Sequence, residues 1–133
     1  MRDLEQMFKG LADQNRLRIL NLLLHGELCV CDIQYVLESS QPNVSRHLTY
    51  LKNSGLVLDR REGPRIYYRL AQPTESLKKS LFAFLREAFG YSGLLTEDSQ
   101  KLKKAIKHGS CTASEWRPYS GLTRAADPTS LKA

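Results

Sequence analysis

One stretch of the chain decides the fold: residues 39–70, which read SSQPNVSRHLTYLKNSGLVLDRREGPRIYYRL. Its first half has the pattern of a short helix, because Ser40 is a favoured N-cap and Pro42 suits a first helical turn, where its missing N–H would have no partner. We expect this helix to end near Ser54-Gly55. Apolar residues at helical spacing mark the face that it buries: Val44, Leu48 and Leu51.

The second half of the stretch is predicted to be a β-hairpin. Residues 56–61 and 65–70 are rich in strand formers, and Glu62-Gly63-Pro64 between them supplies turn residues. The tip of this hairpin is basic. From Ser40 to Arg69 the chain has two acidic residues, Asp59 and Glu62, and six basic ones: Arg46, Lys52, Arg60, Arg61, Arg65 and Arg69.

Upstream of this stretch, apolar residues at helical spacing predict three helices. The first covers about residues 3–12 and is amphipathic. The second follows the N-cap candidates Asp13-Gln14-Asn15, is apolar nearly all round, and ends at His25-Gly26. The third is short and has Asp32 near its start, where a negative charge complements the helix dipole. The second helix is expected to be the centre of the core.

Two short helices joined by a tight turn and followed by a basic hairpin are the parts of a winged helix-turn-helix, whose second helix enters a major groove of DNA. The fold class is therefore mainly α with a small β-hairpin. An isolated basic hairpin is more often a solvated surface, but the preceding helix pair reverses that preference. We assign DNA contacts to the polar outer face of the reading helix and to the hairpin tip: Gln41, Asn43, Ser45, Arg46, His47, Tyr50, Arg61 and Arg65.

Downstream, a long helix is predicted from Thr74 to Phe89, with an apolar stripe wider than a core of this size requires. We interpret the surplus as a dimer interface shared with the first helix. The stripe consists of Leu77, Leu81, Phe84, Leu85, Ala88 and Phe89. A further helix is expected over about residues 97–107, before a tail rich in Ser, Thr, Gly and Pro. This organisation gives a DNA-binding and dimerisation domain at 1–92, and a C-terminal helix with a flexible tail at 93–133.

Size and charge narrow the function. With 133 residues the chain fits one domain, and 20 Lys and Arg against 14 Asp and Glu give a net charge of +6, which favours a polyanionic partner such as nucleic acid or anionic lipid. No apolar run approaches the roughly 18 residues of a membrane span, and the first residues do not resemble a signal peptide. We therefore expect a cytoplasmic protein without a membrane partner, whose three cysteines stay reduced.

Four segments in order resemble the ArsR/SmtB family of metal-responsive repressors: ADQNRLRIL at 12–20, ELCVCDI at 27–33, SQPNVSRHL at 40–48 and SGLV at 54–57. The resemblance covers about residues 3–90 and is nearest to the arsenic-sensing type. Gln14 departs from it, since many relatives have Pro there. The resemblance implies a winged helix homodimer that binds double-stranded operator DNA and releases it when a metal ion or metalloid binds.

Cys29 and Cys31 are the candidate sensing residues, because thiolates are the soft ligands that trivalent arsenic, antimony, cadmium or lead prefer. Residues two apart on an ideal helix point roughly 200° apart, since each residue turns the helix by ~100°. Both sulfurs are therefore expected to reach one ion only if the first turn of the third helix unwinds. Unwinding would disturb the support of the reading helix and so release DNA. A single buried cysteine can also be only a small apolar residue.

The resemblance also implies a third thiol three residues after the second, where this chain has Gln34. Cys111 is the only other cysteine, and we name it as a metal ligand together with Cys29 and Cys31. A site of two thiols is the alternative and suits a methylated trivalent arsenical. The zinc and nickel site of the family is expected to be absent, because the helix at 74–89 offers Glu75 and Glu87 but no histidine.

The predicted function is repression of a metalloid resistance operon, with As(III) or Sb(III) as the inducer and no organic cofactor. A cadmium- or lead-responsive repressor and a thiol-redox-responsive repressor of the same fold remain alternatives. An enzyme, such as a thiol oxidoreductase, is disfavoured, because redox motifs normally place two residues between the thiols and here there is only Val30.

Overall fold

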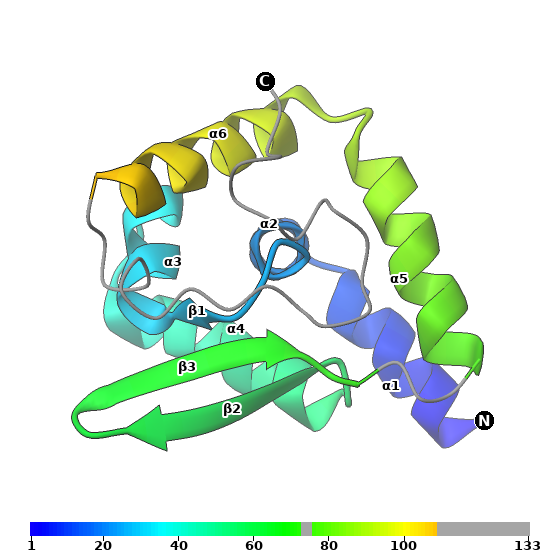
Figure 1. Cartoon of the computed structure of the whole chain (residues 1–133). Coiled ribbons are helices and arrows are strands. Elements are labelled where there is room, and N and C mark those ends of the chain that lie inside the picture. The colour runs from blue at the N-terminus through cyan, green and yellow to red at the C-terminus, as the bar shows by residue number, and fades with distance from the viewer. Residues whose placement is uncertain (73–75, 109–133) are drawn as a thin grey trace.

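The computed structural model describes residues 1–72 and 76–108, which form six helices and a three-stranded sheet (Figure 1). The helices are α1 Arg2–Leu11, α2 Gln14–Leu23, α3 Val30–Leu37, α4 Gln41–Asn53, α5 Ser76–Phe89 and α6 Gly93–Lys107; the strands are β1 Leu28–Cys29, β2 Val57–Glu62 and β3 Arg65–Leu70. No helix in these residues is long and apolar enough to cross a membrane.

Helix α2 is the centre of the core, as its nearly all-round apolar sequence predicts. In Figure 1 it is seen end-on, with the other helices and the sheet around it. The helix begins after Asp13, whose carboxylate accepts a hydrogen bond of 3.1 Å from the backbone N–H of Arg16. Its side chains Ile19, Leu20, Leu22 and Leu23 are completely buried, and each such burial stabilises the fold by about 1.5–3 kcal/mol.

The predicted helix pair is confirmed as α3 and α4. Glu38 ends α3 in the left-handed region, at φ 51°, and so turns the chain sharply toward α4. The Ser40 hydroxyl then accepts a hydrogen bond of 3.3 Å from the backbone N–H of Asn43, and Pro42 lies in the first turn. The predicted apolar face of α4 is fully buried: Val44, Leu48 and Leu51.

The predicted hairpin is confirmed as β2 and β3, which pair from Val57↔Leu70 to Glu62↔Arg65 around a Gly63-Pro64 turn. Gly63 has φ 59°, a conformation that costs glycine little. A third strand was not predicted. The two residues of β1 pair with β3 in the register Leu28↔Tyr68 and Cys29↔Tyr67, which gives the strand order β1-β3-β2.

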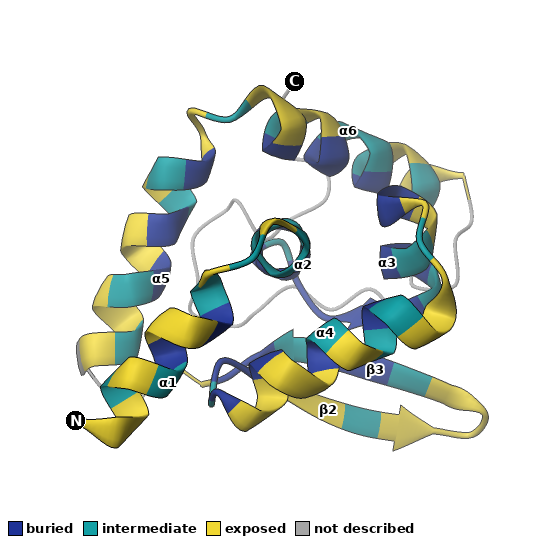
Figure 2. Cartoon of the chain, turned by 180° about the vertical axis from the view of Figure 1, so that it is seen from behind, coloured by how far each residue is buried: buried dark blue, intermediate teal, exposed yellow. Residues whose placement is uncertain are grey.

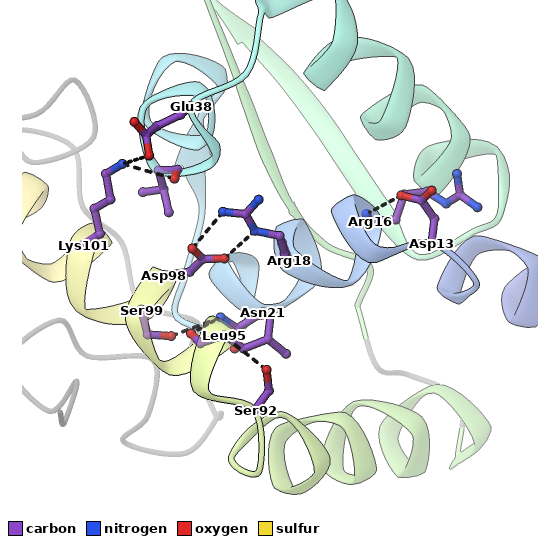
Figure 3. A network of polar contacts seen from close by, with 11 residues as sticks. Asp13, Arg16, Arg18, Asn21, Glu38, Ser92, Leu95, Asp98, Ser99 and Lys101 are labelled. Atoms are coloured by element: carbon purple, nitrogen blue, oxygen red, sulfur yellow. Dashed lines mark hydrogen bonds and ion pairs between the residues drawn. The ribbon is translucent and has the colours of Figure 1, made fainter.

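Helix α6 begins at Gly93, earlier than the predicted start near Glu97, and packs against α2 and α3. Leu102 is completely buried in this contact. A polar network holds the same surface, because the Arg18 guanidinium donates hydrogen bonds of 2.8 and 3.0 Å to the Asp98 carboxylate (Figure 3). The amide of Asn21 donates to the Leu95 carbonyl at 2.9 Å. Helix α6 is thus fixed to the core by both apolar and ionic contacts.

We expect Asp98→Ala to lower the free energy of unfolding by roughly 3 kcal/mol, because it leaves the mostly buried Arg18 cation without its partner. The hydrogen bond to Asp98 raises the pKa of Arg18, so Arg18 stays charged at any accessible pH. Glu5→Ala is the matched control: the Glu5–Lys9 pair is exposed, and its loss should change the stability by less than about 1 kcal/mol. Equal effects in urea unfolding would contradict this assignment.

Candidate functional site

The outer face of α4 has the polar strip that the sequence predicts for a reading helix. Gln41 and Arg46 are exposed, and Asn43 and Ser45 are half-buried between them. These side chains also hold one another: Gln41 Nε2 donates to Ser45 Oγ at 3.1 Å, and Arg46 Nη2 donates to Asn43 Oδ1 at 2.5 Å. Figure 2 shows the exposed face of α4 on the outside of the molecule. Hydrogen-bonding groups are therefore presented in an ordered row, where base edges could be contacted.

His47 lies differently from the prediction. Its ring Nδ1 is 3.7 Å from the Asp13 carboxylate, and its side chain is only 13% exposed. Because position 47 lies between the buried stripe and the polar strip of α4, its side chain turns toward the start of α2. In this structure His47 connects α4 to α2 and is not on the outer face.

Arg16, which sequence reasoning did not select, adds a cation beside the reading helix. Its guanidinium lies 4.1 Å from the ring centroid of Tyr50, which is 40% exposed on α4. The same guanidinium donates to the carbonyls of Gly10 and Lys9, at 2.9 and 3.0 Å. Arg16 was a candidate only through the motif at 12–20, since nothing in the local pattern places it against α4.

The hairpin arginines divide into two kinds. Arg61 and Arg65 are exposed near the tip, as predicted for residues that contact phosphates. Arg60 instead anchors the hairpin: its Nη2 lies 2.7 Å from Glu27 Oε1, and its guanidinium lies 4.5 Å from the ring centroid of Tyr67. Hydrogen bonds to Glu27 and to Glu62 raise the pKa of Arg60 further above its ordinary value. Arg60 therefore joins the hairpin to the segment before β1.

The two cysteine sulfurs are adjacent: Cys31 Sγ lies 3.0 Å from Cys29 Sγ. Cys29 is the last residue of β1 and the N-cap of α3, with extended backbone angles of φ −72° and ψ 146°. It is buried, whereas Cys31 in the first turn is half-exposed. The prediction that the first turn must unwind to bring both sulfurs to one ion is wrong, because it assumed that both residues are helical. The extended Cys29 directs its sulfur toward that of Cys31.

The thiol pair lies between the two predicted DNA-contacting elements. On one side, Cys29 pairs with Tyr67 of β3 in the hairpin. On the other side, α3 packs directly against α4. Cys111 lies outside the described residues. Among those residues, no three His, Cys, Asp or Glu side chains are grouped so that they could hold a metal ion. Two thiols are therefore the ligand set that this part of the chain offers.

An exposed apolar surface lies on α1 and α5, which run side by side in Figures 1 and 2. Phe8 is 58% exposed, Leu77 is 49% exposed and Phe84 is 63% exposed. We call these three residues the α1/α5 patch. Leu85 was predicted to belong to the dimer face, but at 4% exposure it is part of the core of this chain. The helix turns Leu85 inward because it lies on the same face as Phe82 and Phe89, which are also buried.

Comparisons with known proteins agree with this geometry. The family model described as bacterial regulatory protein, arsR family, matches residues 13–58. The arsenical resistance operon repressor of Escherichia coli (strain K12) is 55% identical over 67 residues, 50% of this chain and 57% of that protein. A cadmium resistance transcriptional regulatory protein CadC homolog from Staphylococcus aureus is 41% identical over 87 residues, 64% of this chain and 72% of that protein.

A solved structure has the same fold. It is the homodimeric winged helix-turn-helix DNA-binding domain of a possible ArsR-family transcriptional regulator from Mycobacterium bovis, with a TM-score of 0.57 and 37% identity over 65% of this chain and 78% of that one. The chain spans about half the length of the first curated relatives it matches. The helix pair, the hairpin and the matching segments together lead to one conclusion: this chain belongs to the ArsR family of bacterial regulatory proteins.

Proposed function

We propose that the protein is a cytoplasmic transcriptional repressor, which binds double-stranded operator DNA as a homodimer and releases it when trivalent arsenic or antimony binds Cys29 and Cys31. The observation that carries this proposal is the 3.0 Å separation of the two sulfurs, at a junction that contacts both the hairpin and the support of the reading helix. The names of the relatives, an arsenical resistance operon repressor among them, support the same function.

DNA binding is assigned to α4 and to the hairpin tip. Gln41, Asn43, Ser45, Arg46 and Tyr50 would face the major groove, and Arg61 and Arg65 would contact phosphates. His47 is left out of the base-reading set, because its ring faces Asp13. The net charge of +6 favours the approach of such a surface to DNA.

Arg46 and the tip arginines should differ in what they contribute. Arg46→Ala should weaken operator binding by about 1–3 kcal/mol and relax sequence preference, as expected for a residue that reads a base edge. Arg61→Ala and Arg65→Ala should weaken operator and random DNA alike, and should flatten the dependence of affinity on salt. Fluorescence anisotropy with both DNAs at several salt concentrations measures the difference. Three variants that bind both DNAs like the unmodified protein would overturn the DNA assignment.

Induction follows from the placement of the thiol pair. An arsenic atom bonded to both sulfurs fixes Cys29 and Cys31 in one geometry, and any strain is passed to β3 through the β1 pairing and to α4 through α3. If that geometry fits the DNA-free conformation better, the ligand shifts the population away from the DNA-bound state. No unwinding of α3 is needed for this coupling.

A redox-responsive repressor is the second candidate, because thiols 3.0 Å apart are also placed to form a disulfide. Titration of the reduced, operator-bound protein with arsenite, antimonite, cadmium and peroxide separates the two. Release by arsenite or antimonite at the lowest concentrations supports the proposed function. Release by peroxide alone would replace the metalloid by oxidation as the signal, and release by cadmium alone would make the protein a cadmium sensor.

A further inference from the structure

A pocket of about 630 Å³ lies beside the thiol pair, between α3 and α6. Its lining residues are Cys31, Gln34, Tyr35, Glu38, Ser39 and Lys101. Cys29 does not line it and is buried behind Cys31. A ligand that bonds to both sulfurs must therefore approach past Cys31, and whatever else it carries must lie in this pocket.

The number of bonds that arsenic forms gives the pocket a role. Trivalent arsenic forms three bonds, and in the part of the chain that the structure describes Cys29 and Cys31 are the only thiols. Two bonds to sulfur leave one position on arsenic. Because Cys29 is enclosed by protein, that third position is directed past Cys31 toward Gln34 and Tyr35.

The lining favours an organic group at this position. The ammonium group of Lys101 lies 3.2 Å from a Glu38 carboxylate oxygen and 5.0 Å from the ring centroid of Tyr35, so its charge is balanced at the pocket wall (Figure 3 shows the Lys101–Glu38 pair). The Tyr35 ring and the aliphatic stem of Lys101 then offer apolar surface, while the ammonium group and the carboxylate stay paired. Pockets of this size commonly bind small organic groups.

We propose that this site takes a trivalent organoarsenical with one arsenic–carbon bond, whose aryl group lies against Tyr35 and Lys101. This proposal rests on the proposed function, because it requires Cys29 and Cys31 as ligands. In the binding step an arylarsonous acid exchanges its two hydroxyl groups for two thiolates. Two As–O bonds break, two As–S bonds form, and two water molecules leave with the thiol protons. Arsenic remains trivalent throughout, and no oxidant or reductant is consumed.

The test compares phenylarsine oxide, which hydrates to the arylarsonous acid, with arsenite in releasing the full-length protein from operator DNA. We expect phenylarsine oxide to act at concentrations at least about tenfold lower than arsenite. Tyr35→Ala should reduce this ratio about three- to tenfold by removing an aromatic contact, with arsenite release unchanged. Tyr91→Ala is the matched control, because Tyr91 is 86% exposed and does not line the pocket.

Gln34→Cys supplies a third thiol from the same pocket wall and should reverse the selectivity. We expect it to increase the potency of arsenite about tenfold or more and to abolish the preference for the phenyl compound. Cys111→Ser should leave both responses unchanged. The organoarsenical proposal is overturned if Tyr35→Ala leaves the ratio unchanged, or if Cys111→Ser abolishes release. Release that persists in the double variant Cys29→Ser, Cys31→Ser overturns the proposed function itself, so the two failures are distinguishable.

Discussion

Phe84→Glu should convert the protein to monomers and lower its affinity for operator DNA by about 100-fold or more, since a linked pair of sites gains 10²- to 10⁴-fold over a single one. Phe84 is the most exposed residue of the α1/α5 patch. A carboxylate buried at that position in a dimer would have to lose its hydration without gaining a partner. Monomers cannot hold two reading helices one helical turn of DNA apart.

Analytical ultracentrifugation and anisotropy with operator DNA measure the two effects. Tyr91→Glu is the matched control, because Tyr91 is exposed but lies between α5 and α6, away from the patch. Leu85→Glu should behave differently from both, because Leu85 is in the core and its replacement should unfold the protein. A Phe84→Glu protein that remains dimeric and binds operator DNA normally would refute the dimer assignment.

The double variant Cys29→Ser, Cys31→Ser should stay on operator DNA at arsenite concentrations about 100-fold above those that release the unmodified protein, because hydroxyl groups are poor ligands for a soft metalloid. Its operator affinity should stay within about twofold, since neither thiol lies on the outer face of α4. The fold should persist, because serine is a better N-cap than cysteine and Cys29 makes no side-chain cap hydrogen bond.

Each single variant removes one of two bonds to arsenic and should raise the arsenite concentration at half-release about tenfold or more. The Cys111→Ser protein serves as the control for general loss of thiol reactivity. If the double variant releases DNA at the same arsenite concentration as the unmodified protein, the thiol pair is not the sensor.

The sequence was sufficient for the elements whose signals are local. The Ser40 cap, Pro42 and the apolar stripe at 44–51 predicted α4, and the Glu62-Gly63-Pro64 turn predicted the hairpin. These features depend on neighbours within a few residues, which periodicity and capping preferences describe well. The fold class followed from their order.

The sequence was not sufficient where the structure depends on residues far apart in the chain. Strand β1 has only two residues and exists because β3 lies beside it, so no period could reveal it. Treating Cys29 as helical hid the contact between the two sulfurs, which the extended backbone at the end of β1 produces. Contacts such as Arg60–Glu27 and Arg18–Asp98 join segments 33 and 80 residues apart, and no local pattern announces them.

The central claim is that an arsenic atom bonded to Cys29 and Cys31 is what removes the protein from DNA. X-ray absorption at the arsenic edge, recorded on samples at the arsenite concentration of half-release, counts the sulfur atoms bonded to arsenic in that state. The account predicts two sulfur neighbours in the unmodified protein and in Cys111→Ser, and none in Cys29→Ser, Cys31→Ser. Released protein whose arsenic has no sulfur neighbour, or whose sulfur neighbours disappear in Cys111→Ser alone, would contradict it.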